Sequence, residues 1–414
     1  MKLVLKLKLQ TDKNTDQLLR ETCQGYREVC NRLSEIAFLH RTFFKHDLQK
    51  LAYHSIRVEF DLPSQLVIRA IAEVCSSYKS LLAQIAEHNQ ACKPEERREL
   101  QIIAFHSDVA VPYDPRVLLV DQGKQRVSLR TLSKRVWLDF EVGEKRKHLL
   151  PFVQGQADLK RYGKKWFLFQ TIEVPEAEPI STTNHIGVDL GICTVASSTD
   201  GSHTLRFPGD RIRKARNHHY QLRRGLQRHN TKSSRKRVRK LRDKESRIVR
   251  DYNHLISRRV IAQAQRTNST IVLEDLEGIR KPLRGTPNAS LPREGFREGV
   301  KVRKSQRRER FSWAYAQLIG FIVYKAKLAG IPVLFVPPAY TSKTCSQCHY
   351  MHDSNRVTQA WFECKECGFC WNADDNAAIN IRFLGAESVC QKRTVYMQEY
   401  LHTDRRKPLC FSQG

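Results

Sequence analysis

The sequence predicts a multidomain α+β protein: a small N-terminal β-barrel interrupted by helices, then an α/β domain into which a short metal-binding ribbon is inserted. Three observations predict it. A strand-like segment at residues 2–9 precedes long helical patterns, and further strands follow only after residue 100. The spacing of apolar residues changes again after residues 175–180. Two C-x-x-C pairs lie near the C-terminal end of the sequence. A length of 414 residues suits two or three domains.

The composition indicates a nucleic-acid partner. The 72 lysines and arginines outnumber the 43 acidic residues, which leaves a formal net charge of +29. Because so large an excess repels itself in a compact fold, a polyanion is its natural counterpart, although ribosomal and membrane-surface proteins can be equally basic. We see neither a signal peptide nor an apolar run near the roughly 18 residues of a membrane span. We therefore expect a cytoplasmic protein with no membrane partner.

The N-terminal half shows two periodicities. Residues 2–9 alternate apolar side chains with lysines, as a half-buried strand does, whereas residues 12–40 and 64–84 space their apolar residues at helical intervals. Short strand patterns then recur, separated by charged or glycine-containing turns, at residues 117–120, 126–129, 136–140 and 165–170. We expect the first strand to join this later barrel, so that residues 10–99 form a helical insertion.

The C-terminal half begins behind a linker at residues 175–180. Residues 185–198 read as strand, turn and strand, and the hairpin signal at residues 200–201 leads to a third strand. An apolar stripe then threads a strongly basic segment and breaks near residues 230–234, which predicts two basic helices between residues 211 and 259. The candidates for phosphate contact are Arg235, Lys236, Arg237 and Arg239, and a solvated charged face is the alternative.

The remaining elements complete the α/β domain. A strand at residues 270–276 precedes a polar stretch rich in glycine and arginine at residues 278–310. A helix at residues 312–329 and a strand at residues 331–336 follow. The last helix is expected from residue 372 through residue 381.

Three acidic residues lie at positions where a charged side chain calls for a structural or functional explanation. Asp189 and Glu274 lie in apolar strands, and Asp374 lies in the first turn of the last helix. Singly, each has an ordinary explanation, such as a turn at a strand end or a helix cap. Together, on the first strand of a meander, on a later strand and on a final helix, they match the arrangement of RNase H nucleases. Their hard oxygen atoms suit two magnesium ions about 4 Å apart.

The cysteine spacing predicts a structural zinc site. Cys345 with Cys348 and Cys364 with Cys367 form two C-x-x-C knuckles with fifteen residues between them, the four-thiolate spacing of a zinc ribbon. A redox-active C-x-x-C or chance clustering predicts no second knuckle at that distance. Cys370 has no paired spacing and is left out of the ligand set.

These motifs, taken in order, resemble a known family. GVDLG at residues 187–191, LEDLEGI at residues 273–279, residues 311–348 and NADDNAAINI at residues 372–381 are similar to the split RuvC domain and inserted zinc ribbon of TnpB nucleases. Type V CRISPR effectors are their relatives. The motifs cover residues 180–385, whereas the N-terminal half resembles the family only in its arrangement of first strand, helical insertion and wedge-like barrel.

The resemblance implies a domain order. It implies a wedge-like β-barrel at residues 1–9 and 100–180, a helical recognition insertion at residues 10–99, a RuvC-like core at residues 181–343, a target-binding zinc ribbon at residues 344–368, and a final RuvC-like helix and tail at residues 369–414.

The resemblance also implies an activity: an RNA-guided endonuclease that binds a guide RNA made from a transposon end and cuts both strands of double-stranded DNA beside a short adjacent motif. Asp189, Glu274 and Asp374 would hold two Mg²⁺ ions, and the four knuckle cysteines one Zn²⁺ ion. This block lacks the two acidic residues separated by an arginine that relatives often have, so Asp375 competes with Asp374 as the third ligand.

Other functions stay open. A guided DNA-binding regulator without cleavage would keep the fold but lose the carboxylates, and all three are present here. A miniature CRISPR effector would use a CRISPR RNA instead. A transposase or accessory protein also uses RNase H carboxylates, although the position of the ribbon argues against it. The sequence does not identify the guide, the adjacent motif, the target, the oligomeric state or the role of residues 385–414.

Overall fold

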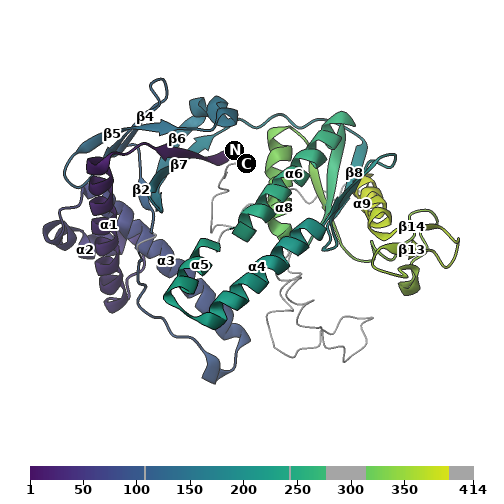
Figure 1. The fold of residues 1–414 in the computed structure, drawn as a ribbon, viewed down its shortest axis with the longest axis horizontal. Helices are drawn as coiled ribbons and strands as arrows, with labels where there is room; N and C mark the ends of the chain where they lie inside the picture. Colours follow the sequence, from purple (N-terminus) through teal and green to yellow (C-terminus); the bar gives the residue numbers. More distant parts are fainter. Residues whose placement is uncertain (107–108, 242–243, 277–313, 391–414) are drawn as a thin grey trace. The chain divides into compact units, whose positions relative to one another are not determined.

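The computed structural model describes residues 1–106, 109–241, 244–276 and 314–390, and Figure 1 shows their elements. They fall into two compact units that divide between Val174 and Pro175, at the start of the predicted linker. The predicted polar stretch at residues 278–310 and the tail from residue 391 lie outside the described residues. No helix in the described part of the chain is long and apolar enough to cross a membrane.

The first unit is built on an antiparallel sheet in the order β2-β6-β7-β1-β5-β4-β3. Its strands are β1 (Lys2–Leu9), β2 (Val111–Tyr113), β3 (Leu118–Asp121), β4 (Arg126–Arg130), β5 (Arg135–Glu141), β6 (Val153–Tyr162) and β7 (Lys165–Glu173). The first strand pairs with β7 and β5, and its alternating leucines are buried on one face. The predicted strands are confirmed; β2 and β6 were missed, because one is three residues long and the other is largely polar.

Three helices stand between β1 and β2 in the sequence: α1 (Lys13–Leu39), α2 (Lys45–Glu59) and α3 (Ser64–Ala91). Asp12 starts α1 with a capping box, in which its carboxylate accepts the N–H of Thr15 at 2.7 Å. The prediction missed α2, which buries only Leu48, Ala52 and Ile56, and it ended α3 too early. Two short 3₁₀ segments follow, η1 (Pro94–Glu96) and η2 (Glu144–Phe152).

The second unit is built on a mixed sheet in the order β10-β9-β8-β11-β12. Its strands are β8 (Asn184–Asp189), β9 (Thr194–Thr199), β10 (Thr204–Pro208), β11 (Ser269–Glu274) and β12 (Val333–Val336). The first three form an antiparallel meander, and β11 lies parallel to both β8 and β12. All five strands were predicted, because their apolar runs are separated by glycine, aspartate or proline turns.

Helices pack on both faces of this sheet. The described helices of the second unit are α4 (Asp210–His229), α5 (Lys232–Leu241), α6 (Lys244–Arg266), α8 (Tyr315–Leu328) and α9 (Ala373–Cys390), of which α4 packs on α5 and α6. Figure 1 shows α6 and α8 on one face and α9 on the other. The predicted break in the basic segment is confirmed at Asn230, which adopts a left-handed φ of 44° between α4 and α5. Residues 242–243, between α5 and α6, lie outside the described residues.

Glycine lets α9 lie directly against the sheet. A Cβ atom added to Gly187 on β8 would stand 2.0 Å from the carbonyl oxygen of Ala378, and one added to Gly385 would stand 2.4 Å from Val272 on β11. Neither position accepts a larger residue without moving the helix. Between β12 and α9 the chain forms the ribbon, with η4 (Asp353–Asn355) and a hairpin of β13 (Trp361–Glu363) and β14 (Cys370–Asn372).

Candidate functional site

Two adjacent strands bring Asp189 and Glu274 to one edge of the sheet. Val188 on β8 is paired with Leu273 on β11, and each acidic residue directly follows its member of that pair. Because the two strands are parallel and neighbouring strands lie about 4.8 Å apart, the two carboxylates end at the same edge. Glu274 is buried, and Asp189 is half-buried.

The start of α9 adds Asp374 to this edge. The side chain of Asn372 accepts the N–H groups of Asp374 and Asp375 at 3.1 and 3.3 Å, which satisfies donors that the first turn of a helix leaves free. Further along the helix, the side-chain amides of Asn376 and Asn380 donate to the carbonyl of Thr344 at 2.8 and 2.7 Å. The asparagines of the NADDNAAIN block therefore fix α9 to the segment that enters the ribbon.

The carboxylates repel one another, as the ligands of a cation site do. Burial, and then the negative charges of Glu274 and Asp374, raise the pKa of Asp189 well above its usual range, while the positive charge of Arg356 works against the shift. Burial also raises the pKa of Glu274, although the hydroxyl of Thr341 donates to its carboxylate at 2.6 Å. Acids of raised pKa gathered at one edge point to a functional site.

The donor set fits magnesium better than a softer metal, because all three side chains offer hard anionic oxygen atoms. These oxygens are not all within 4.8 Å of one another; in the part of the chain that the structure describes, only the four cysteines meet that limit.

Two neighbours of this edge were not predicted. Arg356, which lies in the ribbon, donates from Nη2 to Asp374 at 3.2 Å and to the carbonyl of Gln359 at 2.9 Å. Thr341, which follows β12, holds Glu274. Thr341 lies within the stretch 311–348 that resembles the family, and Arg356 lies between the two knuckles, but the sequence assigns neither a role, because only the fold brings them to the carboxylates.

Asp375, in the first turn of α9, points its side chain at the sheet. Asp189, Ser197 and Arg206 are cross-strand neighbours on β8, β9 and β10. The carboxylate of Asp375 is 1% exposed and accepts the Ser197 hydroxyl at 2.8 Å and the Arg206 Nε at 2.8 Å. Because protein donors already bind both of its oxygens, Asp375 has less acceptor capacity left for a metal than Asp374, to which Arg356 donates.

The ribbon brings the four predicted cysteines together. All four sulfur atoms lie within 4.8 Å of one another, with Cys345 3.7 Å from Cys367 and Cys348 3.5 Å from Cys364. A tetrahedral zinc ion with Zn–S bonds of about 2.3 Å would place its ligands roughly 3.8 Å apart, so the donor set and its size fit zinc.

The two knuckles have the same backbone. His349 and Gly368 directly follow the second cysteine of each knuckle and adopt left-handed φ values of 61° and 69°. The N–H groups of Cys345 and Cys364 donate to the carbonyls of Tyr350 and Phe369 at 3.0 and 2.8 Å. These turns aim the cysteine side chains inward.

The predicted phosphate-contact residues all lie on α5. Arg235, Lys236, Arg237 and Arg239 are exposed, and no ion pair joins them to an acid among the residues the structure describes. By contrast, Arg223 on α4 is already paired with Glu245 at 2.9 Å. Exposed, uncompensated guanidinium and ammonium groups suit a phosphate backbone.

Comparison with known proteins gives two matching family models. One described as "Cas12f1-like, TNB domain" matches residues 315–381, and one described as "Probable transposase" matches residues 169–280. The first covers the chain from α8 through β12 and the ribbon to the start of α9, and the second covers most of β7 and the chain from there through β11.

Two relatives and one solved structure extend the likeness. "Putative RNA-guided DNA endonuclease InsQ" of Escherichia coli K12 is 25% identical over 331 residues, 78% of this chain and 75% of that one. A "CRISPR-associated endodeoxyribonuclease Cas12f1" of Sulfoacidibacillus thermotolerans is 30% identical over 233 residues, 52% of this chain but only half, 50%, of that one. A Cas12f1–sgRNA–target DNA complex shares the fold, with a TM-score of 0.53 and 15% identity over 90% of this chain and 83% of that one. The chain is therefore similar to InsQ and to Cas12f1 nucleases.

Proposed function

We propose that the chain is an RNA-guided DNA endonuclease that cuts both strands at one site. The observation that carries the proposal is the convergence of Asp189, Glu274 and Asp374 at one edge of the second unit's sheet. An antiparallel meander followed by parallel strands and a final helix supports a RuvC-like core, and the names of the relatives point to the same activity.

The domains then take the roles expected from the sequence. Residues 1–9 and 100–180 form a wedge-like barrel, residues 10–99 a recognition insertion, residues 181–343 the first part of the RuvC-like core, residues 344–368 a ribbon that binds the target, and residues 369–414 the final helix and tail. Guide RNA and double-stranded DNA are the partners, and the prokaryotic cytoplasm is the place of action. The exposed cations of α5 support a backbone contact.

The residues of the chain prepare the site for hydrolysis. When bound, a pair of Mg²⁺ ions supplies an activated water and a counter-charge for the leaving oxygen. Asp189 and Glu274 hold their oxygens at adjacent strand ends, and Thr341 fixes the rotamer of Glu274. Arg356 holds one oxygen of Asp374. The ribbon, closed by one Zn²⁺ ion on its four thiolates, keeps Arg356 and the start of α9 in place.

The test begins with the RNA that copurifies with the protein. We expect one structured species with a variable end, whose sequence shows whether it comes from a transposon end or from a CRISPR array. With that RNA, the protein should linearise a plasmid that carries a matched, motif-flanked target, in magnesium and not in a chelator. Degraded, heterogeneous RNA would contradict guidance. Matched DNA that is bound but never cut would favour the regulator, and joined DNA ends would favour the transposase.

A further inference from the structure

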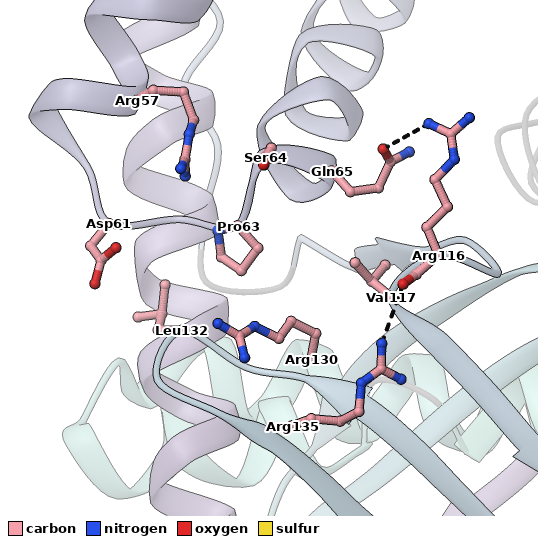
Figure 2. A pocket seen from close by; sticks show the side chains of 10 residues that line it. All are labelled: Arg57, Asp61, Pro63, Ser64, Gln65, Arg116, Val117, Arg130, Leu132 and Arg135. Atoms are coloured by element: carbon pink, nitrogen blue, oxygen red, sulfur yellow. Dashed lines mark hydrogen bonds between the residues drawn. The ribbon is translucent and has the colours of Figure 1, made fainter.

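A pocket in the first unit is lined by more positive charge than the protein neutralises. It has a volume of about 390 Å³ and lies among the start of α3, the α2–α3 connection and strands β3 to β5. Figure 2 shows its ten lining residues, which include Arg57, Arg116, Arg130 and Arg135. Asp61 is the acid among them, and it forms no ion pair with any of the four guanidinium groups in the described structure.

Three of these arginines are held in position by neutral groups. Arg116 donates to the side-chain oxygen of Gln65 at 3.2 Å, and Arg135 donates to the carbonyl of Arg116 and the hydroxyl of Ser128, both at 3.2 Å. Arg57 donates to the carbonyl of Leu62. These contacts orient the guanidinium groups without cancelling their charge, which is how a preorganised anion site is built.

Arg130 differs from the other three arginines in that its guanidinium group is free to bind a ligand. Its guanidinium makes no hydrogen bond or ion pair with any described residue, and Figure 2 shows it reaching across the pocket toward Pro63, with Arg57 pointing into the same space from α2. The first residue of α3, Ser64, also lines the pocket, so the positive end of a 28-residue helix adds to the field.

We propose that this pocket binds a phosphodiester group of a nucleic-acid backbone. The planar guanidinium fork matches phosphate oxygens in pairs, and several forks around one cavity suit a single tetrahedral anion. The inference rests on the proposed function for the source of the phosphate, since the same chemistry would accept a free phosphate. Arg130 and Arg57 would contact the anion, and Arg116 and Arg135 would add to the positive electrostatic potential around it.

The test measures binding by the full-length protein, without any cleavage step. The probes are a short fluorescent DNA duplex and an RNA duplex of the same length, titrated over a range of salt concentrations, and inorganic phosphate followed by calorimetry. The variants are Arg130→Gln, Arg57→Gln and Arg130→Lys. The control is Arg97→Gln, which removes an exposed arginine of the same unit that lies outside the pocket.

Arg130→Gln should weaken duplex binding about tenfold and lower the slope of log affinity against log salt by about 0.9, the change expected when one phosphate is no longer neutralised. Arg130→Lys, which keeps the charge but not the fork, should lie between wild type and Gln. Arg97→Gln should leave both quantities unchanged. A response with DNA alone assigns the pocket to the target, and one with RNA alone to the guide; either supports the proposal.

Unchanged slopes in Arg130→Gln, or an equal loss in Arg97→Gln, would overturn it. So would a pocket that takes up inorganic phosphate, loses it in Arg130→Gln, and has no effect on duplex binding. Because the Arg130 guanidinium has no bonding partner among the described residues, its variants should unfold at the wild-type temperature. If the protein never cuts DNA but Arg130→Gln changes the salt slope, the nuclease assignment fails and the phosphate site stands. If the protein cuts DNA but Arg130→Gln leaves the salt slope unchanged, the phosphate site fails and the nuclease assignment stands.

Discussion

The carboxylate edge and the ribbon, both in the second unit, gather metal-type ligands in opposite ways. The ribbon takes four cysteines from one short stretch, and local turns at His349 and Gly368 aim them inward. The carboxylate edge takes Asp189, Glu274 and Asp374 from two strands and a helix far apart in the sequence. A local site needs its metal in order to fold, whereas a distributed site is positioned by the fold.

The two regions also meet. Arg356 reaches from the ribbon to Asp374, and Ser346 donates its N–H to the side chain of Asn376 on α9 at 3.0 Å. The ribbon is therefore part of the support of the carboxylate edge. Loss of zinc should damage the carboxylate edge, but loss of magnesium should leave the ribbon intact.

The largest effect is expected from opening the ribbon. Cys364→Ser removes one of four thiolates, and because structural zinc contributes on the order of 10 kcal/mol to the folding of small domains, the ribbon should lose both metal and structure. Zinc content measured by mass spectrometry should fall to near zero, and cleavage should be lost. Cys370→Ser is the matched control and should retain both. Full zinc or full cutting in Cys364→Ser would contradict the assignment.

Removing the contact between the ribbon and the carboxylate edge should have a smaller effect on cleavage. Arg356→Gln removes a charge-assisted hydrogen bond to Asp374, and such bonds contribute about 1.5–3 kcal/mol, so cleavage should slow by about tenfold or more. Zinc content and DNA binding should not change. Lys365→Gln is the control, because Lys365 is an exposed ribbon cation paired with Glu363. Equal rates in Arg356→Gln and wild type would show that the regions are not coupled through this arginine.

Substituting Asp375 distinguishes an acid that stabilises the fold from an acid that binds metal. Asp375→Asn should weaken its pairing with Arg206 and lower the free energy of unfolding by about 1–2 kcal/mol, because Arg206 is half exposed and solvent screens the pair. Cleavage should fall only a few-fold. The measurement is denaturant unfolding beside plasmid cleavage, with Asp374→Asn as the comparison. A complete loss of cutting in Asp375→Asn with activity kept in Asp374→Asn would exchange their roles.

The smallest effect on the fold is expected on α5. Replacing Arg235, Lys236, Arg237 and Arg239 by Gln should leave stability unchanged, since all four are exposed. It should reduce the salt dependence of nucleic-acid binding by up to about 0.9 for each phosphate that these side chains neutralise. An unchanged salt slope would mean that these residues form only a solvated face.

The same contrast explains what the sequence could predict. The zinc ligands follow from spacing alone, because four cysteines in one ribbon leave little freedom. The three carboxylates could be named because each is an acid at an apolar strand or helix start, but their approach depends on the pairing of β8 with β11 and on α9 lying against Gly187. That proximity is not a local property of the chain.

What the sequence could not predict depends on tertiary contacts. No local pattern predicts the contacts of Arg356 and Thr341 with the carboxylates, and the role of Asp375 depends on β9 and β10, which place Ser197 and Arg206 against it. The helix α2 was missed because it buries only three residues. The arginines of the phosphate pocket come from four separate segments.

The shared carboxylate site is tested most directly by comparing cutting with binding on the same DNA. Wild type and Asp189→Ala, each with its copurifying RNA, are given a matched plasmid in magnesium, and occupancy is measured by footprinting. We expect that Asp189→Ala, like Glu274→Ala and Asp374→Ala, protects the target as well as wild type does but cuts neither strand, because each removes a ligand of one shared site. Equal cutting by wild type and Asp189→Ala would contradict this assignment.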